Sequence, residues 1–137
     1  MIGPRVGSDL FRQVLRQHLN QLLRWLPAAA RCDPLAVHRA RVATRRLREV
    51  LPVVAPDRRG RALERAARRV TRALGPVREL DVALATLTEF AAVSGLSKDS
   101  IARVASAIDA ERRSLCAGMQ RRLDRCDIRA LGRRVRR

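Results

Sequence analysis

The sequence predicts an all-α fold, an antiparallel bundle of four to five helices forming a single domain over residues 1–137. Apolar residues recur at helical spacing in successive segments, and short stretches with capping residues separate those segments. No segment alternates apolar and polar residues as a half-buried strand would. The only aromatic residues are Phe11, Trp25 and Phe90, so the core must consist of Leu, Val and Ala, which suits closely spaced helices.

Each expected helix has a start or stop signal. Ser8 and Asp9 are suited to begin the first helix and Pro27 to end it. Asp33 is a suitable N-cap for the second, which should run until the prolines of residues 52–56. We expect a first helix over 8–26 and a second from 34. A third should cover 57–74 and stop at Gly75-Pro76, and a fourth should cover 77–93. A fifth should follow Ser97 over 98–125, with a short turn and a basic tail from about 127.

Arginine dominates the charge of the chain. The formal net charge is +17, and every one of the 30 basic residues except Lys98 is an arginine. Such an excess of one sign opposes compaction through self-repulsion, so a polyanionic partner is expected. The planar guanidinium also fits phosphate oxygens two at a time.

The arginines follow two helical stripes. In the second helix, three of them fall within about 80° of His38, opposite an apolar face; this stripe is His38, Arg41, Arg45 and Arg48. The third helix carries Arg58, Arg61, Arg65, Arg68 and Arg72 at the same spacing. Residues 38–78 hold 13 arginines and three acids, a net +10. We expect the two stripes to form a cationic trough, with an ordinary solvated face as the alternative, although solvated faces usually mix both signs.

Catalytic and cofactor signatures are absent from the sequence. There is no P-loop or G-x-G-x-x-G motif, and the acids are scattered. Glu79 and Asp81 are expected to open the fourth helix and complement its dipole. His18 is expected at the edge of the core. We therefore predict no enzyme activity, no cofactor and no metal site.

The cysteines and the N-terminus indicate a soluble, cytoplasmic protein. Cys32, Cys116 and Cys126 have no C-x-x-C spacing and are expected to be reduced thiols. The N-terminus lacks the apolar segment of a signal peptide, and no apolar run approaches the roughly 18 residues that span a bilayer.

The scarcity of aromatic residues bears on which polyanion is bound. Single-stranded nucleic acid is usually held by stacking its bases on aromatic side chains, and no helix-turn-helix or zinc-finger signature is present. The residues favour a ligand with phosphates and no bases to read. Sequence-independent binding of RNA or DNA remains the alternative, and an anionic membrane surface is a weaker one.

Two motifs resemble the CHAD family, α-helical domains named for their characteristic histidines. The family's H-x-x-R-V-x-x-R-R-L-R is matched by His38, Arg41, Val42, Arg45, Arg46, Leu47 and Arg48. Its L-G-x-x-R-D-x-D-V is matched by Leu74, Gly75, Arg78, Asp81 and Val82, with Glu79 in place of an aspartate.

The resemblance implies a helical bundle that binds inorganic polyphosphate without catalysis. It also implies association with polyphosphate-containing granules for some members, and a structural granule protein is a further alternative. Together, stripes and motifs predict a polyphosphate site at His38, Arg41, Arg45, Arg46, Arg48, Arg61, Arg65, Arg68, Arg72 and Arg78.

The chain resembles only the first half of a CHAD domain, which usually contains two similar helical halves. Either a partner supplies the second half, or two copies of the chain pair. Because pairing would bring cationic faces together, we expect a homodimer to be promoted by the ligand.

Overall fold

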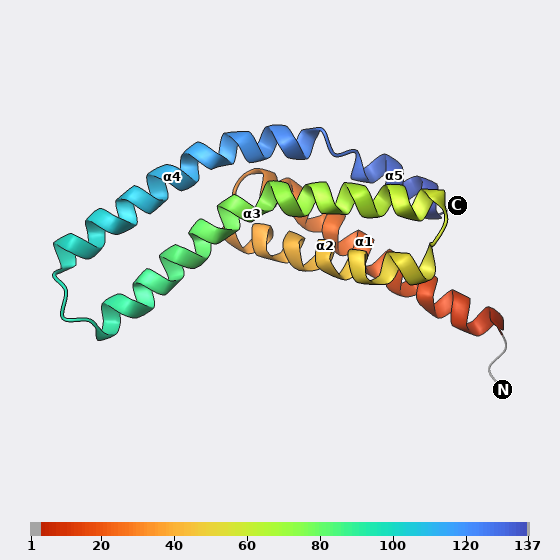
Figure 1. Cartoon of the computed structure of the whole chain (residues 1–137), viewed down its shortest axis with the longest axis horizontal. Coiled ribbons are helices and arrows are strands. Elements are labelled where there is room, and N and C mark those ends of the chain that lie inside the picture. Colours follow the sequence, from red (N-terminus) through yellow and green to blue (C-terminus); the bar gives the residue numbers. More distant parts are fainter. Residues whose placement is uncertain (1–3, 137) are drawn as a thin grey trace.

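The computed structural model describes residues 4–136, with side chains described for residues 8–133, and this part of the chain contains helices and no strand (Figure 1). The helices are α1 (Pro4–Ala30), α2 (Pro34–Val54), α3 (Arg58–Val93), α4 (Lys98–Asp124) and α5 (Ile128–Arg136). α1 packs on α2, α2 on α3, and α3 on both α4 and α5. The prediction of an all-α, antiparallel helical bundle is therefore confirmed.

The first helix continues past the proline at which we expected it to end, because Pro27 lies within α1. The chain reverses only at the next residues, where the Cys32 amide donates to the Ala29 carbonyl (2.9 Å) and the Asp33 amide to the Ala28 carbonyl (3.2 Å). This pair of bonds forms a Schellman helix end, with Cys32 at a φ of 64° where glycine is usual. The turn geometry, and not the proline, ends α1.

The starts of α2 and α3 lie where they were predicted, and each has an aspartate N-cap, of which only Asp33 was predicted as a cap. The Asp33 carboxylate accepts a hydrogen bond from the Ala36 amide (2.8 Å), and the Asp57 carboxylate accepts one from the Gly60 amide (2.8 Å). Gly60 also lets the two helices meet closely, since a Cβ placed there would lie 1.7 Å from the Ala55 carbonyl oxygen. The connection between α2 and α3 therefore depends on both the aspartate and the glycine.

The third and fourth expected helices are one helix. We expected Gly75-Pro76 to separate them, but α3 runs through both residues. Proline removes one hydrogen bond and crowds the preceding turn; here Leu74 and Val77, on either side of it, are fully buried and hold the helix in place. Proline-containing helices characteristically kink, and Figure 1 shows that α3 bends near its middle. Its second half therefore leaves the bundle.

The core lies where α1, α2 and the first half of α3 meet. It consists of aliphatic side chains, as the composition predicted, and includes Leu19, Leu22, Leu47, Leu63 and Leu74, all fully buried. Within the described residues, no helix is both long and apolar enough to cross a membrane.

The second half of α3 and the first half of α4 form a two-helix arm, residues 82–110, that extends beyond the bundle (Figure 1). Ser97 begins α4 as predicted, accepting a hydrogen bond from the Ser100 amide (3.2 Å). None of residues 82–118 is buried, although all of them are described. The arm therefore has no core of its own.

Two of the three cysteines are bonded, contrary to the prediction that all are reduced. Cys32 and Cys116 form a disulfide between the α1–α2 connection and α4, and Cys126 is free. The bonded residues are 84 positions apart in the sequence. Only the packing of α4 across the end of α1 brings them together, so their spacing carried no signal.

A buried ion pair lies beside the disulfide. Arg112 of α4 donates hydrogen bonds to a carboxylate oxygen of Asp81 and to the Cys32 carbonyl. The Arg112 and Asp81 side chains are only 12% and 5% exposed. Asp81 was expected at a helix start, but it lies inside α3 and joins α3 to α4. Removing either partner would leave a buried charge unpaired.

Residues 128–136 form a helix, whereas we expected a turn and a basic tail from about 127. Asp127 accepts a hydrogen bond from the Ala130 amide (3.0 Å) at the start of α5. Ile128 is buried in the core, and Gly132 approaches α1 so closely that a Cβ would lie 2.9 Å from Leu19 Cδ2. Ile128 and Gly132 therefore anchor α5 against the bundle.

Candidate functional site

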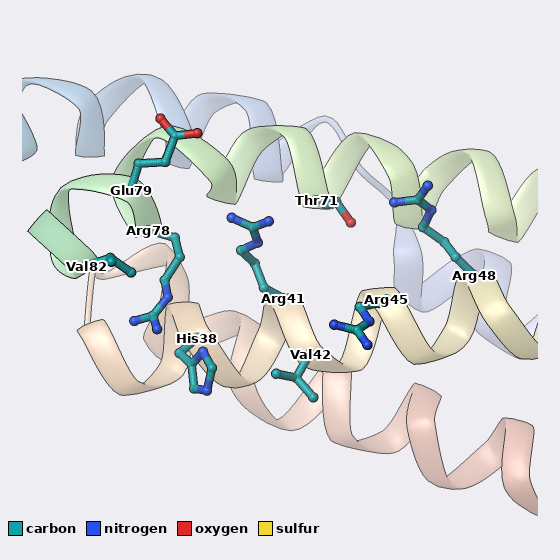
Figure 2. Close-up of a pocket in the computed structure, with 9 residues that line it drawn as sticks. All are labelled: His38, Arg41, Val42, Arg45, Arg48, Thr71, Arg78, Glu79 and Val82. Atoms are coloured by element: carbon teal, nitrogen blue, oxygen red, sulfur yellow. The ribbon is translucent and has the colours of Figure 1, made fainter.

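A groove lies between α2 and α3 and is lined by side chains of both helices (Figure 2). Its lining residues are His38, Arg41, Val42, Arg45, Arg48, Thr71, Arg78, Glu79 and Val82. All four residues of the predicted α2 stripe are among them. The amphipathic pattern of α2 places its apolar residues in the core and leaves this stripe facing the groove.

A pair of threonine hydroxyls holds α2 and α3 together at the groove. Thr71 Oγ1 donates to Thr44 Oγ1 (2.9 Å), and Thr44 Oγ1 donates to the Arg41 carbonyl (2.9 Å). Thr44 is fully buried, so these bonds satisfy polar groups that have left water. The threonine pair ties α2, at the level of Arg41, to α3.

Most cations in the groove have no acidic partner among the described residues. Arg41 and Arg48 form no ion pair there, and Arg48 Nε is buried without a hydrogen-bond partner. Arg45 contacts Glu49 at 3.2 Å, but the two side chains are 81% and 62% exposed, so water and salt weaken the pair. The guanidinium groups are therefore available to an anion from outside.

The bend of α3 adds a cation from the other side of the groove. Arg78 lies just beyond Pro76, and Figure 2 shows its side chain directed toward His38. The pKa of His38 is lowered from 6.5, first by burial and then by the positive charges of Arg78, Arg39 and Arg41. A bound polyanion would oppose this repulsion and raise the pKa again.

The arginine stripe of α3 does not line this groove. Thr71 faces α2, and at 100° per residue these arginines lie about 60° to 120° away from it around the helix axis; this outer stripe is Arg61, Arg65, Arg68 and Arg72. Arg68 pairs with Glu64 (2.8 Å), and Arg61 donates to the Pro56 carbonyl (2.5 Å). The structure thus does not join the two stripes into the single trough that we expected.

A second basic pocket lies on the α4 side of α3. It is lined by Arg69, Arg72, Ala73, Arg122, Arg125 and Cys126. Sequence reasoning missed Arg122, in the last turn of α4, and Arg125, the C-cap residue of that helix, which both complement the helix dipole there. Arg72 therefore lines this pocket and not the groove, although the sequence pattern grouped it with the groove residues.

Arg46 matches the first motif but lies outside the groove. It is exposed, and its charge acts on His18 of α1. His18 is partly buried, at the core edge as predicted, and its pKa is lowered from 6.5 first by burial and then by Arg46. The consecutive arginines 45 and 46 thus face two different neighbours.

The acidic residues of the second motif have separate positions. Glu79 lines the groove and is exposed, and Figure 2 shows its carboxylate directed away from Arg78. Asp81 points to the other side of α3 and pairs with Arg112. Among the described residues, no group of three or more His, Cys, Asp or Glu side chains is arranged to hold a metal ion. The chemistry that the groove offers is the binding of anions by guanidinium and imidazole groups.

The chain matches the family model of the CHAD domain over residues 13–137. The matched range includes every residue that lines the groove. No curated protein and no solved structure matches the chain.

Proposed function

The chain belongs to the CHAD family, and we propose that it binds inorganic polyphosphate, without catalysis, in the groove between α2 and α3. CHAD domains are associated with polyphosphate binding in general. The observation that carries the proposal is a row of arginines beside His38, three from α2 and one from α3, largely free of acidic partners: Arg41, Arg45, Arg48 and Arg78.

The spacing of this row suits a linear anion. Arg41 and Arg48 are two helical turns apart, about 10 Å along the axis at 1.5 Å per residue. Each guanidinium can hold two phosphate oxygens at once. Arg41 and Arg48 form no ion pair among the described residues, so their guanidinium groups can donate to an external acceptor. A flexible phosphate chain lying along α2 can satisfy these donors in succession.

The groove favours a phosphate chain over nucleic acid. None of its nine lining residues is Phe, Tyr or Trp, the only ring is that of His38, and its apolar contribution comes from Val42 and Val82. Successive bases would therefore lack the large aromatic platforms on which single strands usually stack. Sequence-independent binding of RNA or DNA is the second candidate, since the arginines outside the groove present a diffuse positive field. A granule-associated structural role, in which the charge serves assembly, is the third.

A competition experiment tests the choice of polyanion. Labelled polyphosphate is bound to the protein at physiological salt and then challenged with RNA and duplex DNA at equal phosphate concentration. We expect polyphosphate to resist a large excess of either competitor. Displacement at a ratio near one to one would mean a general polyanion surface and would favour the second candidate.

A pair of double variants tests the position of the site. Arg41→Ala with Arg45→Ala removes two groove cations and should weaken polyphosphate binding by about 10-fold or more, as expected for charge-assisted hydrogen bonds. The matched control, Arg12→Ala with Arg16→Ala, removes the same charge at the same spacing from the exposed face of α1. A second control, Arg61→Ala with Arg65→Ala, removes the same charge at the same spacing from the outer stripe. Equal losses from all three would show diffuse attraction in place of a site.

A further inference from the structure

The arm differs from the rest of the chain in its charge. Residues 82–110 contain one arginine, Arg103, and their formal net charge is −1, whereas the remainder of the chain carries +18. We propose that the arm is a homodimer interface, on which the arm of a second copy of this chain packs without any polyanion. The proposal stands on the arm alone and does not depend on the function of the groove.

The arm exposes more apolar side chains to solvent than a pair of helices that packs on nothing else would be expected to. Of its 29 residues, 17 are apolar, yet none of them is buried. Phe90 and Val104 are each 49% exposed, and Val93 and Leu96 are 84% and 57% exposed. An isolated pair of helices buries only the seam between them, so the outer apolar side chains lack a covering layer.

These side chains lie on one side of the arm. At 100° per residue, Val82, Phe90 and Val93 fall within about 80° of each other on α3. On α4, Ile101, Val104 and Ile108 fall within about 60°. Because the two right-handed helices are antiparallel, both sets turn away from the interhelical seam in the same direction. The arm therefore presents one apolar face.

The charge distribution makes the apolar face of the arm the place where a second copy of the chain can pack. Two chains that each carry +18 outside the arm repel one another over the surface of the bundle. The near-neutral arm, which projects away from the bundle (Figure 1), is where two copies can touch with least repulsion. Two such hairpins packed face to face form four antiparallel helices, an arrangement that buries the apolar stripe of each.

The size of the arm suits a small dimer interface. Each of its helices contributes about 12 residues, roughly 20 Å at 1.5 Å per residue. Two helices side by side offer a face at the low end of a standard interface, which buries about 800 Å² per partner. Val82 belongs both to this face and to the lining of the groove, so a second copy would lie beside the groove.

Sedimentation equilibrium of the full chain without polyanion tests the proposal. A Cys126→Ser background removes dimers that would arise through the free thiol. We expect a dimer at micromolar concentration, and we expect Phe90→Glu with Val104→Glu to weaken it by at least about tenfold. The control, Leu35→Glu with Val53→Glu, makes the same charge change at exposed apolar residues of α2 and should leave the dimer intact. Far-UV circular dichroism reports whether each variant is folded.

A milder pair of variants and a salt series complete the test. Phe90→Ala with Val104→Ala adds no charge and should weaken the dimer to a smaller extent. Raising the salt from about 0.1 M to about 0.5 M should preserve or strengthen the dimer, because salt screens repulsion between the bundles. A monomer at all concentrations, equal weakening by both glutamate pairs, or a dimer that forms only with polyphosphate would each overturn the proposal.

Discussion

The bundle and the arm share two helices but differ in packing and charge. The first half of α3 contacts α2, α4 and α5 and buries Leu63, Val70 and Leu74, whereas its second half contacts α4 and buries none of residues 82–93. The apolar spacing continues along the whole helix. Burial along α3 therefore depends on the number of neighbouring helices. The arginines of α3 all lie before residue 82, in the part of the helix that packs in the bundle.

The largest effect expected from this difference is on stability. Leu74→Ala, in the bundle half of α3, should lower the free energy of unfolding by about 3–4 kcal/mol, because it removes a fully buried side chain and leaves a cavity. Leu87→Ala, in the arm half of the same helix, should cost about 1 kcal/mol or less in dilute solution, since Leu87 is only partly buried. Urea denaturation measures both. Equal losses would mean that the arm has a core as well packed as that of the bundle.

The disulfide fixes the base of the arm to the bundle, and its removal is expected to be the next largest effect. Cys32→Ser with Cys116→Ser should lower the free energy of unfolding by about 2–4 kcal/mol, since the bond closes a loop of 84 residues. Thermal denaturation under non-reducing conditions gives the loss, with Cys126→Ser as the control that leaves the bond intact. An unchanged melting temperature would show that the cysteine pair contributes nothing to holding α4 in place.

The junction between bundle and arm can be stiffened by a smaller amount. Gly75 lies within α3 next to Pro76, and a Cβ placed there would meet nothing within 4 Å. Gly75→Ala should therefore raise the free energy of unfolding by about 0.5–1 kcal/mol, the helix-propensity difference between the two residues. Chemical denaturation measures the gain. A loss of stability would mean that the bend of α3 requires glycine at this position.

The smallest expected effects are those of pH, and they have opposite signs for stability and for binding. The pKa values of His18 and His38 are lowered from 6.5 in the folded protein, so the unfolded chain binds more protons below that pH. Stability should then fall as the pH drops through 6.5 toward the folded-state pKa values. Polyphosphate binding should instead strengthen over the same range, because a bound anion raises the pKa of His38 and favours its proton.

Two single variants separate the pH effects. His38→Gln should flatten the pH dependence of polyphosphate affinity, measured by titration at constant ionic strength. His18 lies outside the groove, so His18→Gln should flatten part of the pH dependence of unfolding and leave that of polyphosphate affinity unchanged. If His38→Gln leaves the affinity profile unchanged, the histidine does not contact the anion.

Local signals in the sequence predicted the helix starts and one side of the groove. Asp33 and Ser97 cap the helices they were expected to cap, because a cap bonds an amide only three residues away. The α2 stripe faces the groove because a single helix determines which residues share a face. The direction in which the α3 stripe points was not predictable in the same way, since it depends on which side of α3 meets α2.

The sequence by itself determined the helical class, the aliphatic core, the caps and the excess of positive charge, because these follow from composition and from contacts within a few residues. Only the tertiary structure decided that α3 continues through Pro76, that Cys32 meets Cys116, and that Arg78 joins the α2 stripe while the outer stripe does not. Each of these depends on residues far apart in the sequence. Packing energy can outweigh a local break such as proline, and it fixes rotations and distances that spacing along one helix leaves open.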